Sequence, residues 1–133
     1  MILGIGTDIC DIRRIRALYD KHPERFAAKA FTLGERASCG DRPDPVPCLA
    51  KRFAAKEAVA KALATEDSGS LSWQDVEVFN QPSGRPDIRL HGGAADRLAA
   101  LTPEGCSAHV RLSLSDERDY AVAFAVVEAR PAC

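Results

Sequence analysis

The sequence predicts an α+β fold in which a small, mainly antiparallel sheet packs against a long central helix. Three observations lead to this prediction: an apolar segment with glycines at the start of the chain, an alanine-rich run with helical spacing near the middle, and two pairs of strand-like segments joined by turns. The resulting order is strand, helices, hairpin, helix, hairpin, which is typical of α+β proteins. A chain of 133 residues can bury a real core, and we expect a single domain over residues 1–133.

The first half of the chain should contain one strand and several helices. Residues 1–9, MILGIGTDI, form the expected strand, and their two glycines let another backbone approach closely. Residues 11–22 carry apolar side chains at a helical spacing, surrounded by three arginines. Pro23 interrupts this pattern, and residues 23–39 predict one or two short helices. Residues 41–47 hold three prolines without any period, which indicates a loop.

The second half of the chain begins with the alanine-rich run, which predicts a helix over residues 48–65. Alternating valines and a Pro-Gly turn then indicate a first hairpin, and the sequence SDERD provides the turn of a second hairpin. The elements expected after the long helix are a strand, its partner, a short helix and two further strands, over residues 73–80, 87–91, 92–102, 107–114 and 120–129.

Composition and charge describe an ordinary soluble protein, with 46% hydrophobic and 28% charged residues. Neither a signal peptide nor a run long enough to span a bilayer is visible, so we expect a cytoplasmic protein without a membrane partner. The charge is uneven, because residues 1–61 hold twelve Lys and Arg against eight Asp and Glu, whereas residues 62–133 hold six against eleven. A basic first half predicts a specific anionic partner rather than nucleic acid, with chance unevenness as the alternative.

The five cysteines, at positions 10, 39, 48, 106 and 133, show no pairing pattern. Their number is odd and no CxxC motif occurs, which argues against both a disulfide framework and a zinc site. We therefore expect free thiols in a reducing compartment. None of the three histidines is an evident base for Cys10, so a thiol nucleophile is not expected.

The alanine-rich segment RFAAKEAVAKAL places Glu57 one turn before Lys61, at the border of the apolar stripe. The simple interpretation is an exposed ion pair worth about 0.3–0.5 kcal/mol. Arg52 and Lys56, however, occupy positions where an amphipathic helix favours apolar residues. Three cations and one carboxylate on a single helix suit a site for phosphate and a metal ion. The cations would hold phosphate oxygens and the carboxylate would hold the ion.

Asp8 directly follows the apolar part of the first strand, in GIGTDI. One interpretation is an N-cap for the next helix, a role that Asp fills well. The other is a metal ligand at a strand end. Mg²⁺ usually takes one or two protein carboxylates and completes its shell with water and substrate phosphate. Asp8 and Glu57 would form such a pair if the strand packs beside the long helix. Neither GxxxxGKS/T nor GxGxxG is present to indicate a phosphate loop.

Three segments of the chain resemble the holo-acyl-carrier-protein synthase family, the small 4′-phosphopantetheinyl transferases of bacterial fatty-acid synthesis. These segments are GIGTDICDIRRI at the start, LAKRFAAKEAVAKAL in the middle and VRLSLSDERDYAVAFAVVE at the end. Their order and spacing are similar to the family's over nearly the whole chain. The family's two signature motifs, G-[IV]-[DG]-x-D and F-x-x-K-E-[AS]-x-x-K, are met by Gly4–Asp8 and Phe53–Lys61.

The resemblance implies a 4′-phosphopantetheinyl transferase fold and a concrete reaction. The family moves the 4′-phosphopantetheine arm of coenzyme A to a serine of apo-acyl carrier protein and releases adenosine 3′,5′-bisphosphate. By position, Asp8 and Glu57 match the acids that bind Mg²⁺, for which Mn²⁺ is a possible substitute. Lys61 matches the helix lysine that contacts phosphate and assists proton transfer, so these three residues are the catalytic candidates.

The resemblance also implies binding residues for both substrates. We expect coenzyme A to contact four residues, namely Arg52, Lys56, Lys61 and Thr65. The carrier is acidic, and the family presents basic residues to it at the positions of Arg13, Arg14 and Arg25. The family is trimeric, with the cleft between neighbouring subunits, so a homotrimer is expected.

The chain departs from the family directly after the long helix. A glycine-rich G-T-G-[IV] turn is usual there, but this chain reads Ala64-Thr65-Glu66-Asp67. The two carboxylates could repel the phosphates of coenzyme A, or the loop could point away. Asp116 also stands where many relatives carry a histidine. Two alternatives therefore stay open: a weakened relative that binds the carrier or coenzyme A without fast transfer, and a metal-dependent hydrolase of nucleotide diphosphates.

Overall fold

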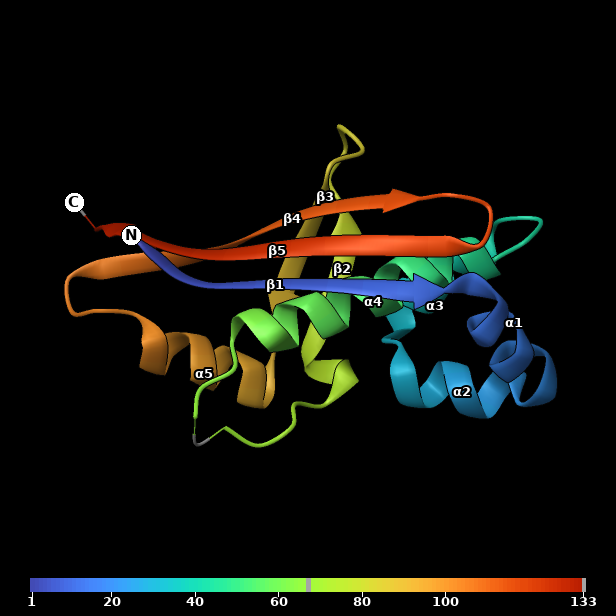
Figure 1. Ribbon diagram of the computed structural model, residues 1–133, viewed down its shortest axis with the longest axis horizontal. Coiled ribbons are helices and arrows are strands. Elements are labelled where there is room, and N and C mark those ends of the chain that lie inside the picture. Colours follow the sequence, from blue (N-terminus) through green and yellow to red (C-terminus); the bar gives the residue numbers. More distant parts are fainter. Residues whose placement is uncertain (67, 133) are drawn as a thin grey trace.

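The computed structural model describes residues 1–66 and 68–132 and confirms the α+β prediction (Figure 1). The elements, in chain order, are β1 (Ile2–Asp11), α1 (Ile12–Lys21), α2 (Pro23–Ala30), α3 (Leu33–Gly40), α4 (Val46–Ala62), the 3₁₀ turn η1 (Trp73–Asp75), β2 (Val76–Asn80), β3 (Pro86–Leu90), α5 (Gly92–Leu101), β4 (Cys106–Asp116) and β5 (Tyr120–Pro131).

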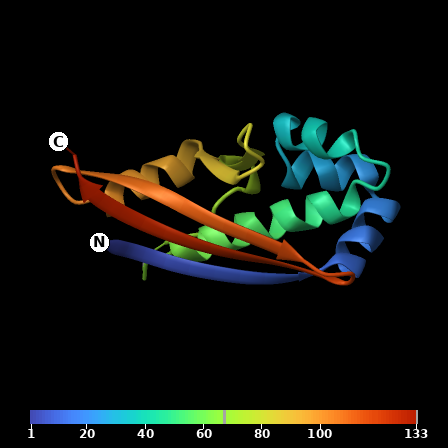
Figure 2. The ribbon, with the colours of Figure 1, turned by 90° about the horizontal axis from the view of Figure 1, so that it is seen from above.

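The three long strands form an antiparallel sheet in the order β1-β5-β4, and β2 and β3 form a separate antiparallel pair. One face of the long sheet packs on α4, which runs beneath the strands in both views (Figures 1 and 2). The helices α1, α2 and α3 gather at one end of this layer, and α5 lies at the other end. The long central helix of the prediction is therefore α4, and the sheet covers it.

Small residues let β1 and β5 approach α4 closely. The inward positions of β5 are alanines and one valine, all buried, and α4 turns buried alanines toward them. On β1, a Cβ added at Gly6 would lie 1.9 Å from the carbonyl oxygen of Ala58, and one at Gly4 would lie 1.9 Å from that of Ala62. Only glycine fits at these two positions, which confirms the close backbone approach expected from the sequence.

The observed boundaries of β1, α1 and α4 differ from the predicted ones, because residues at the helix ends determine where the helices begin. The first strand continues to Asp11, and Asp11 rather than Asp8 caps α1, because its side chain accepts a hydrogen bond from the backbone N–H of Arg13. The capping interpretation of Asp8 is therefore wrong. The long helix begins two residues earlier than expected, since its first turn accommodates a proline, and it ends at Ala62.

The expectation of free thiols is wrong for two of the five cysteines. Cys39, near the end of α3, and Cys48, in the first turn of α4, form a disulfide with a Cα–Cα distance of 5.6 Å. Cys10 and Cys106 are free, and Cys133 lies outside the described residues. The pairing arises because the chain turns back between α3 and α4, a proximity that the spacing of the cysteines does not reveal.

A second, smaller core lies between α2, α3 and α4, around Phe31, the disulfide and Leu49. It also contains the buried carboxylate of Glu35 on α3, which is paired with Lys56 on α4. Within the described part of the chain, no helix combines the length and the apolar character that a bilayer-spanning segment needs.

Candidate active site

The sheet and the long helix bring Asp8 and Glu57 together. Asp8 pairs with Ala123 in the β1–β5 ladder and lies on the same side of β1 as Gly6 and Cys10, both of which are buried beneath the sheet. Glu57 lies in the C-terminal half of α4. Both carboxylates line one pocket of about 290 Å³ between β1, α1 and α4. The close packing of β1 on α4 thus brings both carboxylates to one pocket.

Lys61 binds the strand and not its neighbour on the helix. Its ammonium group donates to the carbonyl oxygen of Thr7 at 2.9 Å and to Oδ1 of Asp8 at 3.3 Å. The interpretation of Glu57 and Lys61 as a simple surface pair is therefore wrong. Burial raises the pKa of the Asp8 carboxyl, whereas the hydrogen bond and the charge of Lys61 act in the opposite direction. The negative charge of Glu57 adds to the rise.

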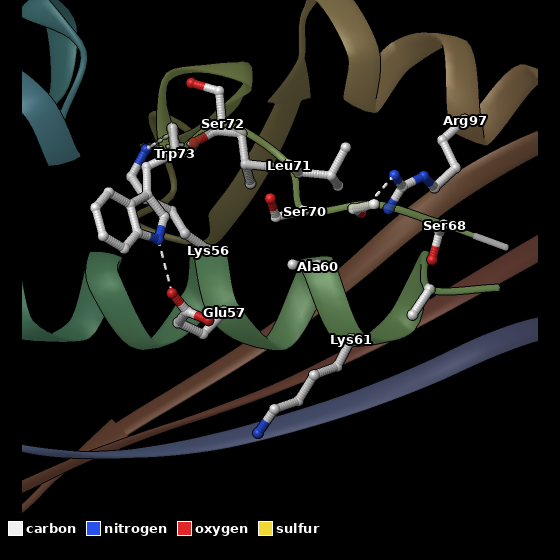
Figure 3. Close-up of a pocket in the computed structure, with 13 residues that line it drawn as sticks. Lys56, Glu57, Ala60, Lys61, Ser68, Ser70, Leu71, Ser72, Trp73 and Arg97 are labelled. Atoms are coloured by element: carbon white, nitrogen blue, oxygen red, sulfur yellow. Dashed lines mark hydrogen bonds between the residues drawn. The ribbon is translucent and has the colours of Figure 1, made fainter. Parts of the chain in front are cut away.

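A tryptophan that the sequence analysis did not single out completes the surroundings of Glu57. The indole Nε1–H of Trp73, in η1, donates to Oε1 of Glu57 at 2.6 Å (Figure 3). In the same view Lys61 extends from α4 toward β1, away from the indole. Residue type and spacing do not connect Trp73 to Glu57, because the contact depends on how the segment after α4 folds back across the helix.

Glu57 also borders a second pocket of about 440 Å³ on the other side of α4 (Figure 3). This pocket is bounded by the segment from Ser68 to Trp73, with Lys61 on one side and Arg97 of α5 on the other. The guanidinium of Arg97 donates to the carbonyl oxygen of Gly69 at 2.8 Å. Glu57 therefore lies between a pocket that contains Asp8 and a larger pocket that is lined by hydroxyl groups and by the cationic residues Lys56, Lys61 and Arg97.

Of the unusual turn, Ala64 lines the larger of these two pockets, whereas Thr65 and Glu66 line neither. Thr65 is exposed, and its backbone N–H and carbonyl group both bind the hydroxyl of Ser68. Glu66 is also exposed and is absent from the pocket walls, whereas Asp67 lies outside the described residues. For Glu66, the structure fits a loop that points away from the site.

Lys56 does not have the environment predicted for a phosphate-binding residue. Its ammonium is fully buried, forms a salt bridge of 2.6 Å with Glu35 and donates to the carbonyl oxygens of Trp73, at 2.7 Å, and of Val76. Burial lowers the pKa of Lys56, and the charge of Glu35 opposes this effect. The interior thus supplies the partners of Lys56, which corrects its predicted contact with phosphate.

Arg52 is also buried, with 3% of its surface exposed, and it faces away from Glu57. Its guanidinium donates to Ser38 Oγ, Cys39 Sγ and the carbonyl oxygen of Val78. It lines a separate pocket of about 200 Å³ together with Arg42 and Lys51, and the wall of that pocket, all within the described residues, includes no Asp or Glu. Within one chain, Arg52 and the carboxylate pair therefore belong to different pockets.

The three arginines proposed for the carrier differ in their partners. Arg13 is paired with Asp11 at 2.9 Å and lies over the ring of Tyr120. Arg14 is exposed and lines the pocket that contains both carboxylates. Arg25, on α2, is exposed. In the described part of the chain neither Arg14 nor Arg25 forms an ion pair, so these two present their charge to solvent.

The donor set suits a hard divalent cation bound by few protein ligands. Across residues 1–66 and 68–132, no group of three or more His, Cys, Asp and Glu side chains could hold a metal ion. Two carboxylates that line one pocket are instead what Mg²⁺ takes when water and a substrate phosphate complete its shell. The proximity of two negative charges in a partly dry pocket also favours a cation between them.

The fold and the paired acids correspond to a known class of transferase. The chain belongs to the 4′-phosphopantetheinyl transferase superfamily, whose sequence model matches residues 4–125.

Individual relatives make this likeness more specific. The holo-[acyl-carrier-protein] synthase of Methylobacterium radiotolerans is 52% identical over 131 residues, which covers 98% of this chain and 96% of the relative. The crystal structure of the holo-[acyl-carrier-protein] synthase from Neisseria meningitidis has a TM-score of 0.80 at 40% identity, covering 96% of this chain and 99% of that one. The Helicobacter pylori synthase in complex with coenzyme A has a TM-score of 0.76 at 27% identity, covering 93% and 99%.

Proposed function

We propose that this chain is a holo-[acyl-carrier-protein] synthase, built as one transferase domain over residues 1–133. It transfers the 4′-phosphopantetheine arm of coenzyme A to a serine of apo-acyl carrier protein and releases adenosine 3′,5′-bisphosphate. The observation that carries the proposal is the shared pocket of Asp8 and Glu57 beside Lys61, on a chain whose relatives are synthases of this kind over nearly their full length.

Asp8 and Glu57 would hold Mg²⁺, with Mn²⁺ as a possible substitute. When bound, such an ion neutralises charge on the diphosphate and on the phosphoryl group in the transition state. Lys61 adds a fixed positive charge at the same place, because its ammonium is already held beside Asp8. The carboxylate of Glu57 is also positioned to accept the proton that the attacking serine hydroxyl loses.

The pocket of about 440 Å³ is the proposed site for the reacting end of coenzyme A, since it adjoins Glu57 and contains Lys61 and Arg97. Thr65, in the segment that follows α4, remains a candidate contact. Lys56 is left out of this set because the interior already satisfies it. Arg52 keeps its proposed role only across a subunit boundary, where its basic pocket would face the phosphates of coenzyme A bound to a neighbour.

A homotrimer is part of the proposal, and the outer face of the long sheet supports it. Ile5, Ile9, Val122 and Phe124 are 40–69% exposed on adjacent strands. Monomers rarely leave such a contiguous apolar surface in water. Copies of the same chain would cover this face. The proposed substrates place the reaction in the cytoplasm.

The test is a transfer assay with purified protein, coenzyme A, Mg²⁺ and apo-acyl carrier protein, followed by mass spectrometry of the carrier. We expect the carrier to gain the phosphopantetheine arm, and Asp8→Ala and Glu57→Ala to abolish this gain while circular dichroism shows an intact fold. A carrier whose mass does not change would support a binding protein instead. Bisphosphate release without any carrier would support a hydrolase.

Carrier docking is tested separately with Arg14→Glu. We expect this change to raise the KM for the carrier more than the KM for coenzyme A, because an acidic partner is then repelled. Arg85→Glu makes the same charge change in the turn between β2 and β3 and should leave both values near the wild type. Equal effects of Arg14→Glu on the two KM values would contradict the docking surface.

A further inference from the structure

Each carboxylate of the site has one oxygen held by the protein and one oxygen available. Oε1 of Glu57 accepts the indole N–H of Trp73 at 2.6 Å, and Oδ1 of Asp8 accepts from Lys61 at 3.3 Å (Figure 3 shows the first). Among the residues that the structure describes, no side chain or backbone group donates to Oε2 of Glu57 or Oδ2 of Asp8. Within this part of the chain, one oxygen of each carboxylate is therefore without a protein donor and free to bind a ligand.

We propose that Trp73 is a positioning residue that fixes the Glu57 carboxylate for the divalent cation. This inference rests on the proposed cation site at Asp8 and Glu57. A glutamate has three side-chain torsions, and holding it in one orientation before the ion arrives removes an ordering cost from binding. Donors behind a metal-binding carboxylate commonly act in this way.

Trp73 can act as a support because it is itself held from three directions. Its ring lies 5.3 Å from that of Phe53, and the ammonium of Lys29 lies 6.0 Å from the ring centre on its face. Its carbonyl oxygen accepts a hydrogen bond from Lys56, which is locked by its salt bridge to Glu35. The buried ion pair thus anchors η1, and η1 carries the indole that anchors Glu57.

The neighbouring residue Gln74 fixes the same turn to α2. Its side-chain amide donates to the carbonyl oxygens of Ala28 and Phe31 at 2.8 and 2.7 Å. Ser72 caps the turn by accepting from the backbone N–H of Gln74. Contacts with α2, with α4 and with the preceding residue Ser72 therefore fix the turn that carries the Trp73 side chain.

An indole is chemically suited to this position. It has a single N–H donor and no charge, so it can hold one carboxylate oxygen but cannot cover both. A lysine or arginine there would neutralise Glu57 and compete with the cation for it. The two acids thus have different hydrogen-bond donors. Asp8 accepts from the charged Lys61, which can also contact phosphate, whereas Glu57 accepts from the uncharged Trp73, which does not neutralise the carboxylate.

The test uses the fact that Trp73 is the only tryptophan in the chain. Expression with β-(3-benzothienyl)alanine in place of tryptophan replaces one N–H by sulfur at position 73 and nothing else. Binding of Mn²⁺ to the purified protein is measured from the electron paramagnetic resonance signal of the free ion. We expect the Kd for Mn²⁺ to rise roughly tenfold, as is typical when a donor behind a metal ligand is lost. A Kd within twofold of the unmodified protein would overturn the inference.

Trp73→Phe is a second variant that removes the same donor and keeps an aromatic ring. It should raise the Kd for Mn²⁺ to a similar extent, and circular dichroism reports whether the fold is retained. Lys29→Met is the matched control, because it removes the cation above the ring and leaves the N–H in place. We expect its Kd to stay within twofold of the wild type. If Lys29→Met raises the Kd for Mn²⁺ as much as Trp73→Phe does, the inference is overturned. The weaker binding would then come from a general disturbance of the packing around the Trp73 ring.

Glu57→Gln separates this inference from the proposed function. If Glu57→Gln binds Mn²⁺ as tightly as the wild type, the proposed cation site fails. If Glu57→Gln loses binding but removal of the indole N–H has no effect, only the role of Trp73 fails. If Glu57→Gln and removal of the indole N–H each weaken Mn²⁺ binding, the double variant Glu57→Gln/Trp73→Phe should bind no more weakly than Glu57→Gln alone. The donor acts only through the Glu57 carboxylate, so its loss has no further effect.

Discussion

Asp8 is less stable as a carboxylate in the folded protein than in the unfolded chain. Partial burial raises its pKa, and the negative charge of Glu57 adds to this effect, while Lys61 offsets part of it. The folded state therefore binds the Asp8 proton more tightly than the unfolded state does. Through this group, stability falls as the pH rises from the ordinary value of 3.8 through the raised pKa, and the loss is complete above it.

Asp8→Asn should therefore increase stability while it removes activity. We expect a higher Tm than the wild type at pH 7.5, because the uncharged amide avoids the burial penalty of a carboxylate. This advantage should shrink as the pH approaches 3.8, where the wild-type carboxyl is protonated in both states. Thermal unfolding of both proteins from pH 4 to 8, without divalent cations, measures the difference. A lower Tm for Asp8→Asn at pH 7.5 would contradict this account.

At the scale of single residues, the sequence indicates candidate metal ligands but not the side chains that contact them. Asp8, Glu57 and Lys61 stand out because charge appears beside apolar or alanine-rich stretches. Lys56 stands out for the same reason, but its partner Glu35 comes from another helix, and nothing in the sequence pairs them. Trp73 looks like an ordinary aromatic residue before a strand. Its contact with Glu57 exists only because η1 is tied to α2 and α4.

Among the elements, the contact between β1 and α4 determines whether a site exists. The two glycines of β1 lie directly against carbonyl groups of the helix, so any side chain there must push the two elements apart. Asp8 is two residues beyond Gly6 on the same side of the strand. A displacement of β1 would therefore move Asp8 away from Glu57 as well as open the core.

Gly6→Ala should cost about 1–3 kcal/mol or more of unfolding free energy, because its Cβ would lie 1.9 Å from the carbonyl oxygen of Ala58. Urea unfolding measures the loss, and Mn²⁺ binding should weaken in parallel. Gly40→Ala is the matched control, since no atom lies within 4 Å of its added Cβ and it ends a helix. We expect the control to stay within about 1 kcal/mol of the wild type. A Gly6→Ala variant as stable as this control would disprove the close-packing argument.

The disulfide between α3 and α4 gives a second prediction about elements. Replacing both Cys39 and Cys48 by serine should lower the unfolding free energy by about 2.5 kcal/mol, because the short loop between them is no longer closed in the unfolded chain. Urea unfolding with and without a reductant checks this, and the reductant should affect only the wild type. Alkylation of the denatured protein should find two more thiols after reduction than before it. Equal numbers before and after reduction would contradict the pairing.

The order of elements could be read from periodicity and turn residues, and the structure confirms that order. The disulfide could not be read in this way. An odd cysteine count and a spacing of nine residues fit many arrangements, and the pairing depends on how α3 turns back onto α4. The first residues of α4 were missed for a related reason. Prolines suggest a loop in sequence, but the first turn of a helix accepts them.

For the whole molecule, the exposed apolar face of the long sheet is the feature that a single chain leaves unexplained. Ile5 and Ile9 of β1 lie beside Val126 and Val122 of β5 in the ladder, so the apolar side chains are contiguous. The sequence predicted a trimer only through its family resemblance. In the sequence, β1 has the pattern of an ordinary strand with one buried face. Only the structure shows that α4 covers the side with the glycines and Asp8, which leaves the isoleucines exposed.

Phe124→Glu should therefore dissociate the proposed homotrimer, because it places a charge in the middle of this face. Sedimentation or light scattering measures the mass in solution, and coenzyme A binding should fall with it if the cleft lies between subunits. Leu33→Glu makes the same change at an exposed residue of α3, outside the sheet, and should leave the mass unchanged. A wild type that sediments as a monomer would contradict the assembly.

The alternation of β1 also restricts how the chain can vary in length. Asp8 faces the helix and Ile9, its neighbour, faces outward. One residue inserted between Gly6 and Asp8 would turn every later side chain of β1 to the opposite face of the sheet. Asp8 would then lie on the apolar outer face, and Ile9 would lie against α4. Insertions and deletions among homologous chains should therefore be confined to the connections around α4 and absent from β1.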